Sequence, residues 1–253
     1  MVGARHAQQL RAHPAGVIVY GRNAVKEALR GRRASSVVEI LVSEALSREP
    51  WLGSRTVRVS SAEAIERACG SREHQGICAE LAGYPYVSAG ELLNAPSPLI
   101  VALDEVQDPQ NLGAICRTAE CVGASGVVIC ERRAAEVTPA VCRASAGAVE
   151  HLRIARARNL ADFLLSARAA GCWCYGAAAS AQATDYAQPD YSGGVVIVFG
   201  AEGRGLRRRV AESCDALVRL PLRGQIASLN VNAAAGALLY EVLQKREPLD
   251  RTP

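Results

Sequence analysis

Three unbroken apolar runs constrain the fold of this 253-residue chain more than any other feature. They span 99–103, 127–130 and 195–199. An unbroken apolar run is typical of a parallel strand covered on both faces, because a strand with one wet face alternates polar and apolar residues. Helix-like segments separate these runs. Strands that alternate with helices predict an α/β fold built on a largely parallel sheet.

A proline-rich stretch over 84–98 divides the chain, and we interpret it as a linker. Before it, a small α/β domain is predicted over 17–83. After it, the parallel-sheet domain is predicted over 99–253, and residues 1–16 are interpreted as a basic tail. The small domain is expected to contain strands over 17–20, 37–42 and 77–81 and helices over 21–29 and 62–69.

Composition favours a soluble protein of the cytoplasm. The apolar runs are far shorter than the roughly 18 residues that a membrane span needs, and the N-terminal residues lack the apolar core of a secretory signal. The nine cysteines are interpreted as buried thiols in a reducing compartment. Only Cys172 and Cys174 are closely spaced, and one such pair is a poor zinc signal, so no metal is expected.

The charge distribution favours a phosphate-bearing partner more than the net charge does. A formal charge of +4 does not by itself indicate nucleic acid. Arginine, however, is the residue best suited to bidentate phosphate contacts. Six arginines gather near the end of the chain: Arg204, Arg207, Arg208, Arg209, Arg219 and Arg223.

Polar loops follow three of the predicted strands, over 104–111, 200–205 and 220–230. Ligands of parallel sheets bind beyond the carboxyl ends of the strands, so we expect these loops to form one site. The glycines of 200–205 have the spacing GxxGxG, not the GxGxxG of dinucleotide sites, and no GxxxxGK[ST] loop occurs. The residues that the three segments contribute are Asn111, Arg117, Glu202, Ser228 and Asn230.

Each of these residues also has a purely structural interpretation. Asn111 and Ser228 could cap helices. Arg117 could pair with Glu120 at i+3, and Glu202 could be a surface carboxylate. A pair in the small domain, His74 and Gln75, could likewise form only a packed turn at a strand start.

Three segments, over 103–119, 198–206 and 220–231, resemble in order and spacing the SpoU/TrmH group of RNA 2′-O-ribose methyltransferases, within the SPOUT class. The first segment reads Leu103-Asp-Glu-Val-Gln-Asp-Pro-Gln-Asn-Leu-Gly-Ala-Ile-Cys-Arg-Thr-Ala119, and the second reads Val198-Phe-Gly-Ala-Glu-Gly-Arg-Gly-Leu206. The small domain is similar, through 20–25 and 74–77, to the substrate-binding domain of bacterial 23S rRNA guanosine 2′-O-methyltransferases.

The resemblance implies S-adenosylmethionine as methyl donor, a C-terminal trefoil knot and a homodimer. It implies ribose 2′-O-methylation of RNA, of a 23S rRNA guanosine in the first instance, with no role for DNA. A tRNA substrate, methylation of rRNA that confers antibiotic resistance and a non-catalytic RNA-binding assembly protein are the alternatives. This sequence departs from the family pattern at Asn232, where many relatives have serine.

The resemblance also assigns residues to roles. The five polar residues above would be catalytic. Backbone groups around Phe199, Gly200, Leu220 and Leu229 would hold the cofactor. RNA contacts are expected from Arg22, Asn23, His74, Gln75 and Arg204.

Overall fold

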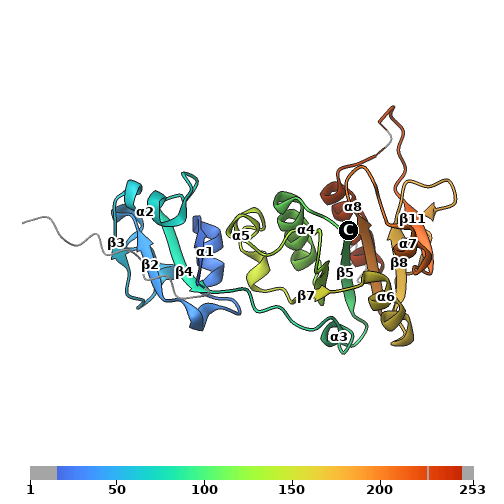
Figure 1. Ribbon diagram of the computed structural model, residues 1–253, viewed down its shortest axis with the longest axis horizontal. Helices are drawn as coiled ribbons and strands as arrows, with labels where there is room; N and C mark the ends of the chain where they lie inside the picture. Colours follow the sequence, from blue (N-terminus) through green and yellow to red (C-terminus); the bar gives the residue numbers. More distant parts are fainter. Residues whose placement is uncertain (1–15, 227, 247–253) are drawn as a thin grey trace, which may run out of the picture. The chain divides into compact units, whose positions relative to one another are not determined.

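The computed structural model describes residues 16–226 and 228–246, and the chain divides into two compact units, Met1–Tyr84 and Pro85–Pro253 (Figure 1). The basic tail predicted over 1–16 lies outside the described residues, except for Gly16, which begins the first strand. None of the described helices is both long enough and apolar enough to cross a membrane.

The first unit is a four-stranded sheet with two helices. Its strand order is β1-β4-β2-β3, and β4 runs antiparallel to both β1 and β2. Ser61 accepts a hydrogen bond from the Ala64 N–H to begin the second helix, which ends at Gly70 in the left-handed conformation. The elements are β1 (Gly16–Tyr20), α1 (Arg22–Ala28), β2 (Glu39–Val42), β3 (Arg58–Val59), α2 (Ala62–Cys69) and β4 (Ile77–Ala82).

The second unit is built on a seven-stranded sheet with the order β7-β6-β5-β10-β8-β11-β9. All six strand pairings are parallel, which confirms the predicted fold class. The three apolar runs form central, fully buried strands. The strands are β5 (Leu99–Asp104), β6 (Gly126–Cys130), β7 (Ile154–Ala157), β8 (Trp173–Ala177), β9 (Thr184–Asp185), β10 (Val195–Gly200) and β11 (Ala216–Arg219).

Helices cover both faces of this sheet. Alternate residues of a strand face opposite sides, and Ile100 and Ala102 of β5 pack in one cluster with side chains of α3, α6 and α7. On the other side α4 contacts α5, α8 and β6, while α8 contacts β10. The helices are α3 (Ala89–Leu92), α4 (Pro109–Cys121), α5 (Pro139–Ala144), α6 (Leu160–Ala169), α7 (Arg208–Glu212) and α8 (Val231–Arg246).

The segment interpreted as a linker packs against the second unit from Pro85 onward. The Tyr86 ring lies 3.8 Å from the guanidinium carbon of Arg156, and its hydroxyl accepts a hydrogen bond from the Val137 N–H at 2.8 Å. Leu92 in α3 is 1% exposed and belongs to the core of the second unit. The segment also contains a short helix (Ala89–Leu92), and Val87 and Leu93 pack half-buried against the same core.

Candidate functional site

A cavity of about 830 Å³ opens beyond the carboxyl ends of β8, β10 and β11. This volume lies in the range of small-molecule sites, and the position is where parallel sheets bind ligands. Two of the three predicted loops line it. Among the predicted site residues, its lining includes Phe199, Gly200, Glu202, Arg204, Leu220, Ser228, Leu229 and Asn230.

The loop after β10 folds back tightly on its own strand. A Cβ at Gly200 would lie 2.1 Å from the carbonyl carbon of Gly205, so only glycine fits there. The Gly205 N–H donates to the Ala201 carbonyl at 2.8 Å and closes the loop. We expected Gly200 to admit a ligand, and the close approach in the structure is instead that of the loop's own returning backbone.

Another part of the cavity lining was not predicted. It is formed by the end of β8 and the residues after it, Ala177 to Ser180, together with Tyr186 and Leu238. Small apolar residues without a polar motif gave no chemical signal. Since β8 lies next to β10 in the sheet, the rule that ligands bind at carboxyl ends of strands would have indicated this segment once the strand order was known.

The lining is largely apolar, with one carboxylate at the rim. Leu222 and Leu229 are 39% and 48% exposed, which is unusual for leucine and leaves apolar surface open within the cavity. Glu202 is exposed and accepts a hydrogen bond from the amide nitrogen of Asn230. An apolar cleft with a few polar groups is typical of small-molecule and cofactor sites.

Asn230, and not Ser228, begins the last helix. The Asn230 side-chain oxygen accepts a hydrogen bond from the Asn232 N–H at 2.9 Å, and α8 starts at Val231. The capping alternative for Ser228 is therefore wrong, and the cap lies two residues later. Ser228 is exposed and lines the cavity without this structural duty.

Asn111 does not line the cavity but connects to its rim. It is 4% exposed, and its side-chain oxygen accepts a hydrogen bond from the Asn232 amide at 3.0 Å. The cap of α4 is Asp108, which accepts from the Gln110 N–H, so the capping alternative for Asn111 is wrong. A chain of hydrogen bonds thus runs from Asn111 through Asn232 and Asn230 to Glu202.

Arg117 lies on the exposed face of α4 and outside the lining of the cavity. Within the described part of the chain its guanidinium has no ion pair, so the alternative pairing with Glu120 is not formed. Its charge is available to a ligand that approaches from solvent.

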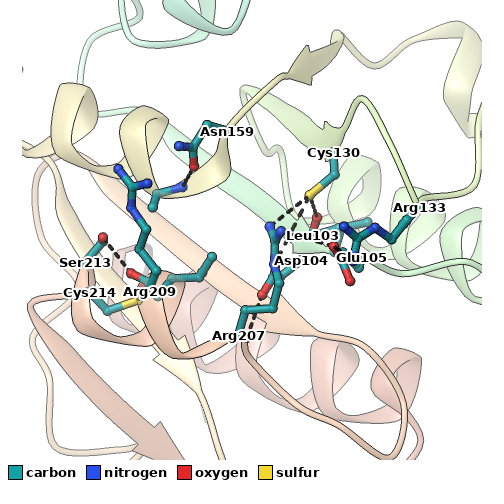
Figure 2. A network of polar contacts seen from close by, with 12 residues as sticks. Leu103, Asp104, Glu105, Cys130, Arg133, Asn159, Arg207, Arg209, Ser213 and Cys214 are labelled. Atoms are coloured by element: carbon teal, nitrogen blue, oxygen red, sulfur yellow. Dashed lines mark hydrogen bonds and ion pairs between the residues drawn. The ribbon is translucent and has the colours of Figure 1, made fainter.

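Of the six arginines near the end of the chain, three form ion pairs with carboxylates in the described part of the structure and three do not. Arg207 donates through Nε to Asp104 at 2.7 Å and through a terminal nitrogen to Glu105 at 3.0 Å (Figure 2). Partial burial alone would lower the pKa of Arg207, but the hydrogen bond and charge of Asp104 outweigh it and raise that pKa. Arg208 and Arg209 pair with Glu212 and Asp162. Arg204, Arg219 and Arg223 are exposed and have no ion pair among the described residues.

In the first unit, the predicted RNA contacts are not equivalent. Arg22 pairs with Glu49 at 2.6 Å, and its backbone N–H donates to the Gln75 side chain at 2.9 Å. His74 is 7% exposed and accepts from the Gly76 N–H through Nδ1, as the packed-turn alternative expects. Arg22, Asn23 and Gln75 are exposed, so these three remain accessible.

All nine cysteines are free, and six of them are buried. The prediction of burial is wrong for Cys121, which is exposed, and only partly right for Cys69 and Cys214, which are half-buried. Within 16–226 and 228–246 no group of three or more His, Cys, Asp or Glu side chains is placed to hold a metal ion.

Two family models match the chain. Residues 98–240 match the model described as the SpoU rRNA Methylase family, and residues 18–87 match the model described as RNA 2′-O ribose methyltransferase substrate binding. The first match alone covers more than half of the chain.

Similar proteins include a Bacillus subtilis (strain 168) protein named "Putative TrmH family tRNA/rRNA methyltransferase YacO". It is 38% identical over 237 residues, which are 85% of this chain and 95% of that protein. An AdoMet-bound rRNA methyltransferase from Sinorhizobium meliloti superimposes with a TM-score of 0.76 at 28% identity, covering 90% of this chain and 87% of its own. A structure described as an RNA 2′-O ribose methyltransferase superimposes with a TM-score of 0.76 at 25% identity, and the match covers 91% of this chain and 89% of that chain.

Proposed function

Because this chain belongs to the SpoU rRNA methylase family, we propose that it methylates a ribose 2′-hydroxyl of RNA, on a guanosine of 23S rRNA. RNA methylation as its class of reaction, and S-adenosylmethionine as its methyl donor, follow from the family and from the similar AdoMet-bound structure. The 2′-oxygen is supported by the match of residues 18–87 to a 2′-O-ribose substrate-binding model.

One observation supports the proposal more than any other: the cavity brings the predicted cofactor residues and three predicted catalytic residues into one space. In this proposal Phe199, Gly200, Leu220 and Leu229 hold the cofactor, which supplies an electrophilic methyl group when bound. The exposed leucines enclose its apolar parts. Glu202 lies at the rim, where a carboxylate stabilises positive charge.

The protein must align the 2′-oxygen with the methyl group and assist the loss of the hydroxyl proton. The hydrogen bonds from Asn111 to Glu202 fix the rim, which is an alignment role. A guanidinium stays charged near neutral pH, so we assign Arg117 to holding an RNA phosphate and stabilising the developing alkoxide. Water or a neighbouring acceptor takes the proton.

A homodimer, a C-terminal trefoil knot and a cytoplasmic location belong to the same proposal. The dimer is supported by α8, where Ala233, Ala237 and Tyr240 are exposed at helical spacing and give one face of small and aromatic residues. Sedimentation equilibrium measures the mass directly, and a monomer at assay concentration would remove the dimer from the proposal.

The reaction is tested by incubating the protein with S-adenosylmethionine and either 23S rRNA or total tRNA, followed by mapping of 2′-O-methylated riboses. We expect one new methylated ribose, on a guanosine of 23S rRNA. Methylation of a base would overturn the 2′-O assignment. Methylation of tRNA alone would select the tRNA alternative, and the absence of both S-adenosylmethionine binding and methyl transfer would select a non-catalytic RNA-binding assembly protein.

Two variants test the site. Arg117→Ala should retain cofactor affinity and lose methylation, because its role is on the RNA side; loss of both would exclude that role. Glu202→Gln should slow transfer while the fold is kept. Glu212→Gln is the matched control, since Glu212 is an exposed carboxylate in α7 that does not line the cavity and pairs, within the described part of the chain, with Arg208 alone.

A further inference from the structure

A second cavity, of about 500 Å³, lies where β7 ends and α7 begins. Three of its lining residues, Arg207, Arg209 and Val210, follow directly in sequence after Gly200 to Leu206, which line the first cavity. β7 ends at Ala157, and the next residue, Arg158, lines the second cavity. The second cavity therefore lies at the carboxyl edge of the parallel sheet, as the first cavity does. Three of its lining residues, Asn159, Arg207 and Arg209, are drawn as sticks in Figure 2.

Arginine dominates the lining of this second cavity: Arg158, Arg207 and Arg209 face one carboxylate, Asp162. Arg207 is held in place by the carboxylates of Asp104 and Glu105. Arg158 is exposed and has no hydrogen bond or ion pair among the residues that the structure describes. At least one guanidinium is therefore free for a ligand.

Arg209 can be released at little cost. Its ion pair with Asp162 measures 2.8 Å, but the two side chains are 70% and 58% exposed. Exposed pairs are weak because water and salt screen them. A phosphate, which carries a full charge and accepts two parallel N–H bonds from a guanidinium, can replace the Asp162 carboxylate as the partner of Arg209.

We propose that the second cavity binds a backbone phosphate of the substrate RNA, with Arg158 and Arg209 as direct contacts and Asp162 as an internal competitor for Arg209. The proposal rests on the RNA substrate proposed above. An RNA strand whose reacting ribose lies at the first cavity carries a phosphate at every nucleotide, so the basic cavity along the same edge meets the strand.

The test uses a fluorescein-labelled fragment of 23S rRNA that the unaltered protein binds, with its affinity measured over a series of KCl concentrations. Arg158→Gln and Arg209→Gln should each weaken binding several-fold. Each should also reduce the slope of log affinity against log salt by roughly 0.7 to 0.9, the amount expected for one lost phosphate contact.

Arg153→Gln is the matched control. Arg153 is exposed and directly precedes β7, so it lies at the amino end of the strand that Arg158 follows. Its substitution removes the same charge and should leave both affinity and slope much closer to the original values. Asp162→Asn should act in the opposite direction and tighten RNA binding, since it frees Arg209 and removes a negative charge.

The proposal is overturned if Arg158→Gln and Arg209→Gln behave like Arg153→Gln, or if Asp162→Asn weakens binding. Cofactor affinity should stay constant in all four variants, which separates RNA contacts from a loss of folding. If the unaltered protein methylates a base instead of a ribose, the proposed reaction fails while these affinity differences still stand. If ribose methylation is found and the differences are absent, only the second cavity is refuted.

Discussion

Arg207 joins segments that lie 103 residues apart, and its contacts show how a single side chain can connect the loops after two strands of the sheet. Its backbone N–H and its guanidinium both bind Asp104, whose side chain is fully buried at the end of β5. The arginine-rich run around Arg207 predicted a phosphate contact for this residue. Its neighbours in the sequence do not indicate that its guanidinium is already paired with the buried carboxylate of Asp104.

Removing the Arg207 guanidinium should destabilise the second unit. Loss of one partner of a buried pair costs about 3–5 kcal/mol, and since Arg207 is itself 43% exposed we expect Arg207→Met to cost roughly 2–3 kcal/mol. Urea denaturation gives the free energy of unfolding. Arg208→Met removes a neighbouring arginine that is 92% exposed and should change this free energy by less than about 0.5 kcal/mol. Equal losses in the two variants would contradict a structural role for the Asp104 contact.

Thiol reactivity should distinguish a single cysteine, Cys121. It is the one exposed member of the nine, whereas burial raises the pKa of Cys78 and of Cys214 to about 12 and keeps their thiols protonated near neutral pH. The thiolate is the reactive form, so those two should react slowly. Titration of the native protein with a chromogenic disulfide reagent should show Cys121 reacting first, ahead of the half-buried Cys69, and Cys121→Ser should abolish this first phase. A first phase that is unchanged by the substitution would contradict the burial pattern.

At the scale of elements, long apolar runs were predictable and short elements were not. β5, β6 and β10 are fully buried over their apolar runs, as both-face covering requires. β9 has two residues and α7 has five, too few to show a period of two or of 3.6. The strand order places β8 beside β10, and this non-local pairing is why the cavity wall after β8 could not be predicted from the sequence.

Two helical glycines should respond oppositely to alanine. Alanine is favoured over glycine in a helix by about 0.8–1.0 kcal/mol. At Gly113 in α4, however, a Cβ would lie 2.5 Å from the Ala144 side chain and 2.9 Å from the Ser145 nitrogen. Overpacking of this kind costs about 1–3 kcal/mol, so Gly113→Ala should be destabilising overall.

Gly236 in α8 is the matched case, because a Cβ at this position would have no neighbouring group within 4 Å. Gly236→Ala should therefore raise the free energy of unfolding by up to about 1 kcal/mol, as measured by urea denaturation. Destabilisation at protein concentrations where a dimer forms, with stabilisation of the monomer, would show that α8 packs closely on a second copy.

At the scale of the whole molecule, the candidate cavity and the match to the substrate-binding model lie in different units. The cavity and the hydrogen bonds behind it lie entirely within Pro85–Pro253, whereas the residues matched to substrate binding, 18–87, lie almost wholly within Met1–Tyr84. The first domain was predicted to end at residue 83, and the structure divides the chain after Tyr84. The packing of 85–98 on the second unit was not predicted, because the contacts of Tyr86 and Leu92 depend on residues far along the chain, such as Val137 and Arg156.

A chain that begins at Pro85 should therefore fold, and a chain that begins at Leu99 should be much less stable. The shorter chain lacks Leu92, whose loss alone resembles a buried leucine truncation of about 2–5 kcal/mol, and it leaves Arg156 without the Tyr86 ring. Thermal unfolding should show a cooperative transition for 85–253 near that of the second unit in the full chain, with cofactor affinity retained and RNA affinity reduced. The transition of 99–253 should be shifted to a much lower temperature or lost, because the side chains that cover β7 and α6 have been removed. Equal stability of the two shortened chains would show that residues 85–98 are a linker after all, whereas unfolding of both would show that the second unit depends on the first.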